Sequence, residues 1–130
     1  MKVTYDPHLL GPKGEQIAAD YLAENGYRII KRNYRFHRNE IDIIALHQKT
    51  LCFVEVKTRF SSANGHPAES VTRQKQQEII KAAQAYLTIS GQIDTECRFD
   101  VVAILIQEME ENRIDSFTIE HFTDAFWANS

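Results

Sequence analysis

The segment NEIDIIALHQKTLCFVEVKTR, residues 39–59, decides the fold, because it holds two apolar runs separated by a polar turn. Runs rich in Ile, Val and Leu on either side of a short turn predict two antiparallel strands joined as a hairpin. Four charged residues interrupt these runs: Glu40, Asp42, Glu55 and Lys57. Ionisable side chains are seldom buried unless they are paired, so these four are the first candidates for a functional site.

The register of this hairpin predicts which charged residues meet. A turn centred on residues 48–49 places Asp42 opposite Glu55 and Glu40 opposite Lys57. Opposed residues have their β-carbons about 5 Å apart, and two carboxylates at that separation repel by roughly 3 kcal/mol at an effective dielectric near 20. Such a repulsion is a large fraction of the total stability of a domain, about 5–15 kcal/mol, so we expect the pair to be compensated. Either one carboxylate holds a proton or a cation lies between them.

The oxygen ligands of Asp42 and Glu55 favour a hard divalent cation, which predicts Mg²⁺ or Mn²⁺ rather than zinc. Such an ion beside the ammonium group of Lys57 suits phosphodiester hydrolysis. The ion polarises the phosphate and acidifies bound water, while the lysine orients or deprotonates the attacking water. The alternative is a surface cluster of ion pairs, each worth about 0–1 kcal/mol, without any chemistry.

The order of the remaining elements predicts an α/β domain. Side-chain alternation places Ile41, Ile43 and Ala45 on one face of the second strand and Ile44 and Leu46 on the other. Strands that are apolar on both faces are typical of a sheet covered by helices on both sides. We therefore expect a three-layer α/β/α fold with a mixed central sheet in the order αβββαββ, followed by a short C-terminal helix. The first expected helix spans about residues 12–25, the second is capped by Ser70 or Thr72 and reaches about residue 90, and a short helical tail ends at Trp127. The expected strands span residues 27–36, 40–46, 51–58, 99–106 and 114–122.

Length and composition indicate one ordinary globular domain over residues 1–130. The chain is 43% hydrophobic and 25% charged, which excludes disordered and fibrous proteins. The opening MKVTYDPHLL lacks the apolar core of a signal peptide, and the longest aliphatic run, residues 101–106, is far too short to span a bilayer. We expect a cytoplasmic protein that does not contact a membrane. Cys52 and Cys97 lack zinc-ligand spacing and are predicted to be buried thiols.

Charge is unevenly distributed along the chain, although the net charge is only −3. Residues 28–38 carry five basic side chains and no acid, a pattern that attracts a polyanion locally. An edge strand with protective charges explains the same pattern equally well. In residues 108–124 the balance reverses, with six acids against Arg113. Arg98 and Asp100 alternate onto one face of the fourth strand, where a structural ion pair is favoured over a DNA contact by Arg98.

Two helical residues are further candidates. Lys75 shares a helical face with Ile79, which would point its amine toward the sheet near the end of the third strand. Glu15 borders the apolar stripe of the first helix. The alternatives are that Lys75 extends to solvent and that Glu15 favours the helix N-terminus.

Several short motifs together resemble the YraN-like family of small bacterial proteins (UPF0102). They are the pair Gly14-Glu15, NEID at 39–42, FVEVKTR at 53–59, Lys75 and RFDVV at 98–102. This family is similar to the PD-(D/E)xK nuclease superfamily, notably the archaeal Holliday junction resolvases, and the match covers nearly the whole chain. The resemblance implies a restriction endonuclease-like α/β/α core, which agrees with the order of elements above.

The resemblance also implies roles for individual residues. It implies Asp42, Glu55 and the carbonyl of Val56 as metal ligands, Lys57 as the catalytic lysine and Glu15 as an accessory acid. Beside these we expect Glu40 as a further accessory acid. The basic residues expected to contact nucleic acid are Arg32, Arg35, Arg38, Arg59 and Lys75.

Three functions are weighed on this basis. The leading hypothesis is an Mg²⁺- or Mn²⁺-dependent endonuclease acting on DNA, including branched or junction DNA, for which two active sites and hence a homodimer would be needed. The second is a nucleic-acid-binding module of the same fold that does not cut. The third is an interaction protein whose acidic C-terminal segment docks a partner through Phe122, Phe126 and Trp127, aromatics that would otherwise pack on the core.

Overall fold

The computed structural model describes residues 7–60 and 71–127 of the chain. In this part of the chain the helices and strands follow the predicted order αβββαββ. Their bounds are α1 Pro7–Glu24, β1 Tyr27–Phe36, β2 Asn39–His47, β3 Thr50–Phe60, α2 Arg73–Ser90, β4 Cys97–Glu110 and β5 Arg113–Phe126.

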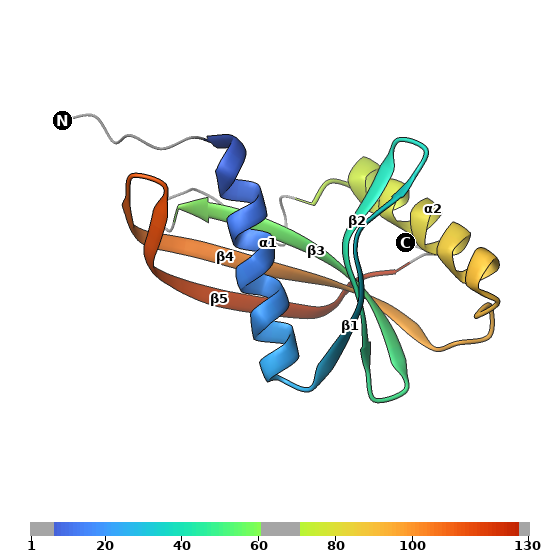
Figure 1. Cartoon of the computed structure of the whole chain (residues 1–130). Helices are drawn as coiled ribbons and strands as arrows, with labels where there is room; N and C mark the ends of the chain where they lie inside the picture. Colours follow the sequence, from blue (N-terminus) through green and yellow to red (C-terminus); the bar gives the residue numbers. More distant parts are fainter. Residues whose placement is uncertain (1–6, 61–70, 128–130) are drawn as a thin grey trace.

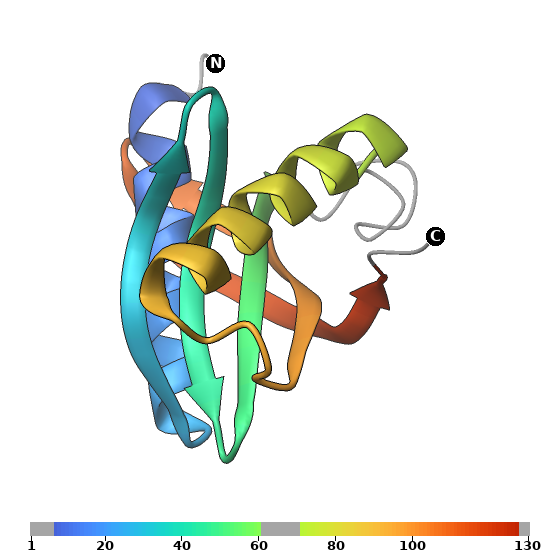
Figure 2. The same cartoon turned by 90° about the vertical axis from the view of Figure 1, so that its right-hand side faces the viewer.

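The five strands form one mixed sheet in the order β1-β2-β3-β4-β5 (Figure 1). Strands β3 and β4 pair in parallel, with α2 between them in the sequence, and the other neighbours pair antiparallel. Helix α1 lies against one face of the sheet and α2 against the other (Figure 1, Figure 2). This arrangement confirms the expected three-layer α/β/α fold, because each face of the sheet buries its apolar side chains under one helix.

Two separate core clusters fill the layers. Under α1, the side chains of Ala18 and Leu22 pack with Ile43, Val54 and Ile104 of the sheet, all buried. Burial of each large aliphatic side chain contributes about 1.5–3 kcal/mol. The helix stripe predicted from the sequence therefore faces the sheet.

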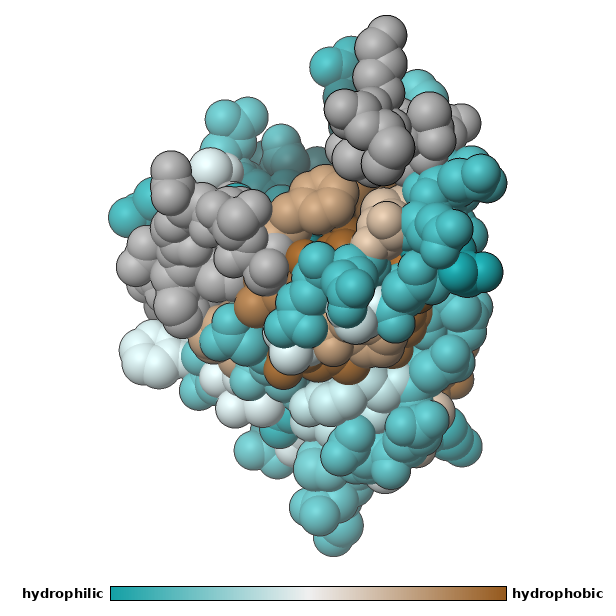
Figure 3. All heavy atoms as spheres, turned by 90° about the vertical axis from the view of Figure 1, so that its left-hand side faces the viewer, coloured by the Kyte–Doolittle hydropathy of each residue, from teal (hydrophilic) through white to brown (hydrophobic). Residues whose placement is uncertain are grey.

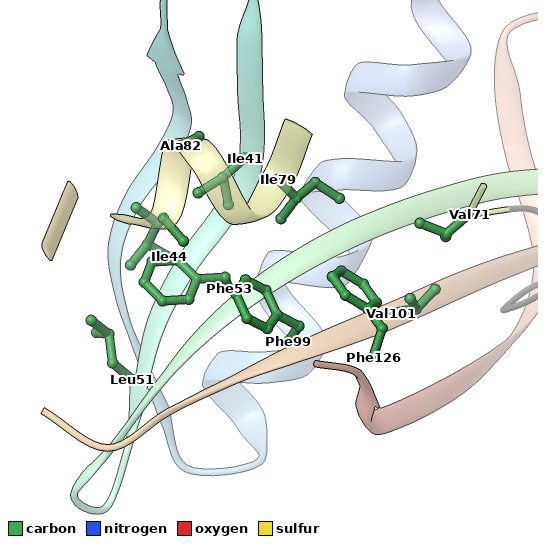
Figure 4. Close-up of a cluster of buried hydrophobic side chains, with 11 residues drawn as sticks. Ile41, Ile44, Leu51, Phe53, Val71, Ile79, Ala82, Phe99, Val101 and Phe126 are labelled. Atoms are coloured by element: carbon green, nitrogen blue, oxygen red, sulfur yellow. The ribbon is translucent and has the colours of Figure 1, made fainter. Parts of the chain in front are cut away.

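Under α2, the second cluster combines aliphatic side chains with three buried phenylalanines (Figure 4). Ile79 packs over the sheet residues Phe53 and Phe99. The rings of Phe53 and Phe99 stack with centroids 5.6 Å apart, and Phe126 stacks on Phe99 at 5.0 Å. This run of rings ties β3, β4 and the end of β5 together.

The expected short C-terminal helix is wrong, since β5 continues to Phe126. Phe126 pairs with Phe99 across the ladder and is buried against it, so the extended conformation buries an aromatic ring there. Phe122 also packs against this cluster, so these two aromatics serve the core. Trp127 is 63% exposed, with its indole N–H donating to Asp124.

Helix α1 begins at Pro7, five residues before the expected start at Pro12. Proline is favoured in the first turn of a helix, and Pro7 occupies that position while Pro12 lies inside the helix. Helix α2 begins after Thr72, whose hydroxyl accepts a hydrogen bond from the Lys75 backbone N–H. Thr72 is one of the two predicted N-caps, and this prediction is confirmed. The other predicted cap, Ser70, lies outside the described residues.

Glycine is required where α1 approaches β3 most closely. A β-carbon at Gly14 would overlap with Oγ1 of Thr58 and lie 2.9 Å from its β-carbon. Without a side chain at this position, the helix rests directly on the strand. The next residue, Glu15, is thereby held beside the polar end of the sheet.

Cys52 is buried, as predicted. Cys97 is exposed, so the prediction that its thiol is buried is wrong. Cys97 is the first residue of β4, where the strand emerges from a turn.

No helix in residues 7–60 and 71–127 is both long and apolar enough to cross a membrane. On the face at the left of Figure 1, hydrophobic residues are visible near the middle, with hydrophilic side chains below them and to their right (Figure 3).

The close packing of α1 on β3 predicts that Gly14→Ala destabilises the protein by about 1–3 kcal/mol, because the added methyl group overlaps with Thr58. Urea denaturation measures this change, and the double variant with Thr58→Ala should regain part of the loss. Gly11→Ala is the matched control on the same helix. Its β-carbon would meet no atom within 4 Å, so it should be neutral or stabilising. Equal stabilities of the two glycine variants would contradict this packing.

Candidate functional site

The hairpin register is confirmed close to the turn and fails at the charged residues. Residues 43–47 of β2 pair with residues 50–54 of β3, as predicted, and the ladder stops there. At the next position the side chain of Asp42 replaces the ladder, with Oδ2 accepting a hydrogen bond from the backbone N–H of Val56 at 2.8 Å. Asp42 is therefore held beside Val56 rather than directly opposite Glu55, and the expected ladder pair is wrong.

Strand β2 changes faces at the position where its ladder with β3 ends. Ile41 packs in the cluster under α2 and Ile43 in the cluster under α1, although regular alternation would place them on one face. The opposing strand has Asn33 at this position, between the ladder pairs of its neighbours, with a left-handed φ of 53°. The expectation that Ile41 and Ile43 share a face is thus wrong, because the alternation of β2 is interrupted at Asp42, the position opposite Asn33.

Glu55 is a buried carboxylate with incomplete compensation. Its side chain is 5% exposed, and its Oε1 atom is buried with no hydrogen-bond donor among the described residues. The Lys57 ammonium lies 3.7 Å from Oε2. Burial, followed by repulsion from Asp42, raises the pKa of Glu55 to about 8, while the positive charges of Lys75 and Lys57 act in the opposite direction. Asp42 and Glu55 therefore interact strongly, although they do not form a ladder pair.

A second group of acids meets Asp42 from the side of α1. Glu15, Glu40 and Asp42 each offer a carboxylate oxygen, and these oxygens lie within 4.8 Å of one another. Burial raises the pKa of Glu15, and the charges of Asp42 and Glu40 raise it further, with Arg32 opposing them. Asp42 therefore interacts both with this group and with Glu55.

Glu40 does not face Lys57, contrary to the register prediction, because the β2–β3 ladder ends before it. Its Oε2 atom instead forms an ion pair with Nη2 of Arg35 at 2.7 Å. The amide nitrogen of Asn33, in the orientation that satisfies its neighbours, lies 3.2 Å from Oε1 of Glu40 and 2.9 Å from Oε1 of Glu15. Sequence reasoning missed Asn33. The available signal was an asparagine in the middle of a predicted strand, where this residue type is disfavoured.

The predicted nucleic-acid-binding residues are distributed around these acids. Arg32 donates a hydrogen bond to Gln16 of α1, and Arg35 forms an ion pair with Glu40. Lys75, in the first turn of α2, is close enough to Glu55 to lower its pKa. Arg38 is exposed in the β1–β2 turn, and Arg59 is half-buried near the end of β3. The structure thus brings Arg32, Arg35 and Lys75 to the acids, while no described contact links Arg38 or Arg59 to them.

Arg98 and Asp100 form a structural ion pair, as favoured from the sequence. Both oxygens of the buried Asp100 accept from Arg98, at 2.9 and 3.0 Å, and Nε2 of His121 lies 2.8 Å from Oδ2. Burial alone would raise the pKa of Asp100, but the hydrogen bonds from His121, Arg98 and the Asp124 backbone N–H hold it below its ordinary value. The Arg98 guanidinium also donates to Tyr27 Oη, so its polar groups are used within the fold.

The donor set fits a hard divalent cation. Asp42 and Glu55 supply carboxylate oxygens, and Glu55 Oε1 has no other partner among the described residues. In a strand, the N–H and C=O of one residue point to the same side, so the carbonyl of Val56 faces Asp42 as its N–H does. Oxygen ligands of this kind suit Mg²⁺ or Mn²⁺.

The site lies within the region matched by a family model. The model described as "Uncharacterised protein family UPF0102" matches residues 14–104, which include Gly14, the hairpin and Asp100. The chain belongs to the UPF0102 family. A UPF0102 protein of Chlorobium limicola is 64% identical over 123 residues, with 95% of each chain covered. A UPF0102 protein of Geobacter sulfurreducens is 49% identical over 118 residues, covering 91% of this chain and 88% of the relative.

Among solved structures, the Ca²⁺ complex of Pyrococcus furiosus SfsA is similar to this UPF0102 chain at 18% identity and a TM-score of 0.38. The alignment covers 91% of this chain and 64% of SfsA. A TM-score of this size is too low to support conclusions about function.

The raised pKa of Glu55 predicts how the metal-free protein responds to pH. The folded protein keeps this proton up to about pH 8, whereas the unfolded chain releases it near the ordinary value of 4.5. The folded state therefore binds more protons between these values, and the free energy of unfolding should fall as pH rises, by up to about 1.4 kcal/mol per pH unit.

Urea denaturation between pH 5 and 8 in the presence of a chelator measures this slope. Glu55→Gln, which cannot ionise, should flatten it, while Asp94→Asn, an exposed acid in the turn before β4, should leave it unchanged. Parallel curves for the parent and Glu55→Gln would show that Glu55 titrates normally.

Proposed function

We propose that this chain is a divalent-metal-dependent endonuclease of the cytoplasm that hydrolyses phosphodiester bonds in DNA. The observation that supports the proposal most strongly is Glu55, a buried carboxylate with one unpartnered oxygen, next to a second carboxylate and a lysine. Such a cluster costs stability in a metal-free protein, and a functional site is a physical reason for retaining it.

The roles follow from the positions of the groups. Asp42, Glu55 and the Val56 carbonyl would hold Mg²⁺ or Mn²⁺, which when bound supplies Lewis-acid polarisation of the phosphate and a more acidic water. Lys57 lies beside Glu55, where its ammonium group can donate to a phosphate oxygen or orient the attacking water. The hydrogen bond from Val56 fixes Asp42, which leaves its other oxygen, Oδ1, for the ion.

Basic residues near the acids support a polyanionic substrate. Arg32 and Arg35 on β1 lie beside Glu15 and Glu40, and Lys75 approaches from α2, so cations reach the acids from the edge strand and from one helix. Arg38 and Arg59 extend the predicted contact surface along the hairpin and β3. Because phosphate contacts release counterions, DNA binding should weaken steeply with salt. Branched or junction DNA is the proposed substrate class, and two cuts in a four-way junction would require a homodimer.

A non-catalytic nucleic-acid-binding module is the second candidate, favoured by the five basic side chains and absence of acids in residues 28–38. Binding alone does not require two interacting carboxylates beside a lysine. Retention of Asp42, Glu55 and Lys57 therefore favours cleavage over binding. The third hypothesis, an interaction protein that docks a partner through its C-terminal aromatics, loses support, because Phe122 and Phe126 pack in the core.

Cleavage should depend on the metal and on the three central residues. Single-stranded, duplex, flap and four-way DNA are incubated with Mg²⁺ or Mn²⁺, and at least one should be cut by the parent protein and spared in EDTA. Asp42→Asn, Glu55→Gln and Lys57→Ala should each lower the rate by about 10²–10⁴-fold, since each removes a ligand or donor that acts on the reacting phosphate.

The control for the acid variants is Asp94→Asn, which should cut at the parent rate. Cleavage that persists in Lys57→Ala and Asp42→Asn would identify a contaminating nuclease. Tight, salt-sensitive binding of DNA by a parent that cuts none of the four substrates would favour the binding module.

A further inference from the structure

Asn33 occupies an unusual place in the hairpin. It lies in the middle of β1, yet its φ of 53° is left-handed, whereas strands are extended. Its neighbours pair with Ile43 and Ile41, so Asn33 falls opposite Asp42. Asparagine tolerates this conformation better than most residues, but the conformation remains costly for any side chain other than glycine.

Packing does not explain the conformation. Asn33 is exposed, so no burial of its side chain offsets the strain. The conformation does redirect the chain. Before Asn33, Arg32 bonds to Gln16 on α1, and after it Tyr34 packs edge-on against Tyr86 of α2, with ring centroids 5.3 Å apart. The edge strand therefore changes faces at the same position as β2 does.

The amide group of Asn33 contacts two acids from different elements. Its nitrogen lies 2.9 Å from Oε1 of Glu15 on α1 and 3.2 Å from Oε1 of Glu40 on β2. A primary amide carries two N–H donors, so one can serve each carboxylate. A neutral donor suits this position, because it links the two acids without adding a positive charge that would compete with a cation for them.

We propose that Asn33 is a positioning residue that holds the carboxylates of Glu15 and Glu40 beside Asp42. The metal and substrate consequences of this arrangement rest on the nuclease function proposed above, whereas the contact itself does not. Glu15 and Glu40 lie on separate elements and repel each other, and they would move apart without the shared donor. The oxygens of Glu15, Glu40 and Asp42 within 4.8 Å of one another are the result of that contact.

The proposal is tested first in metal-free protein by replacing Asn33 with glycine. Asn33→Gly keeps the left-handed backbone accessible and removes only the amide group. Gln48→Gly is the matched control, since Gln48 is also left-handed, with φ 57°, in the β2–β3 turn at the other end of β2. A change specific to Asn33→Gly therefore reports the amide rather than the backbone.

Crystal structures of the metal-free variants give the decisive readout. Without the shared amide, the carboxylates of Glu15 and Glu40 should move apart in Asn33→Gly, so that their oxygens and those of Asp42 no longer lie within 4.8 Å of one another. Asn33→Asp, which keeps the shape but replaces the donors with a further carboxylate, should separate them more. Gln48→Gly should leave them in the parent arrangement. An unchanged arrangement in Asn33→Gly would overturn the proposal.

Mn²⁺ titration separates this proposal from the proposed nuclease function. Where the parent binds Mn²⁺, Asn33→Gly should weaken the affinity about 10–100-fold while its unfolding curve stays close to that of Gln48→Gly. Parent affinity in Asn33→Gly, with a changed stability instead, would assign Asn33 a purely structural role and overturn the proposal. A parent that binds no Mn²⁺ and cuts no DNA would defeat the nuclease function, and the positions of the Glu15 and Glu40 carboxylates in Asn33→Gly would then decide the role of Asn33.

Discussion

The hydrogen bond from the Val56 backbone N–H to Asp42 is the interaction on which the candidate site depends. It forms where the β2–β3 ladder ends, so a carboxylate replaces a strand partner and satisfies an N–H that would otherwise be unpaired. The same bond holds Asp42 beside Val56, on the side of the strand to which the Val56 carbonyl also points. Because the ladder ends here, the carboxylate of Asp42 lies between β2 and β3 in place of a backbone hydrogen-bond partner.

Electrostatics explains why the cluster is shared among several elements. Acids come from α1, β2 and β3, and the cations near them come from β1, β3 and α2. Asp100 offers a contrast within the same sheet. It is more deeply buried than Glu55 and yet has a lowered pKa, because Arg98, His121 and a backbone N–H satisfy its oxygens. Glu55 lacks such donors, which distinguishes a site that can accept a ligand from one that is already satisfied.

Local patterns predicted much of this molecule correctly. The apolar periodicity located the strands and the α2 helix within a few residues, and the turn at residues 48–49 set the register of residues 43–47 against 50–54. The charged residues were recognised because they interrupt apolar runs. Periodicity assumes regular alternation, however, and that assumption failed at Asn33 of β1 and at the opposite position of β2, where both strands change faces. Glu40 pairs with Arg35 instead of Lys57, because the β2–β3 ladder ends before it.

The sequence by itself determined the element order, the two-sided burial of the sheet and the identity of the central acids and lysine, since these depend on residue type and spacing along one chain. Only the tertiary structure decided which acids meet. Glu15 reaches Asp42 because Gly14 lets α1 rest on Thr58, and Asn33 joins Glu15 to Glu40 across two elements. The strand conformation at Phe126 was likewise decided by a distant ring, Phe99. Contacts between elements far apart in sequence depend on packing distances of a few tenths of an ångström, and the spacing of residues along the chain does not encode them.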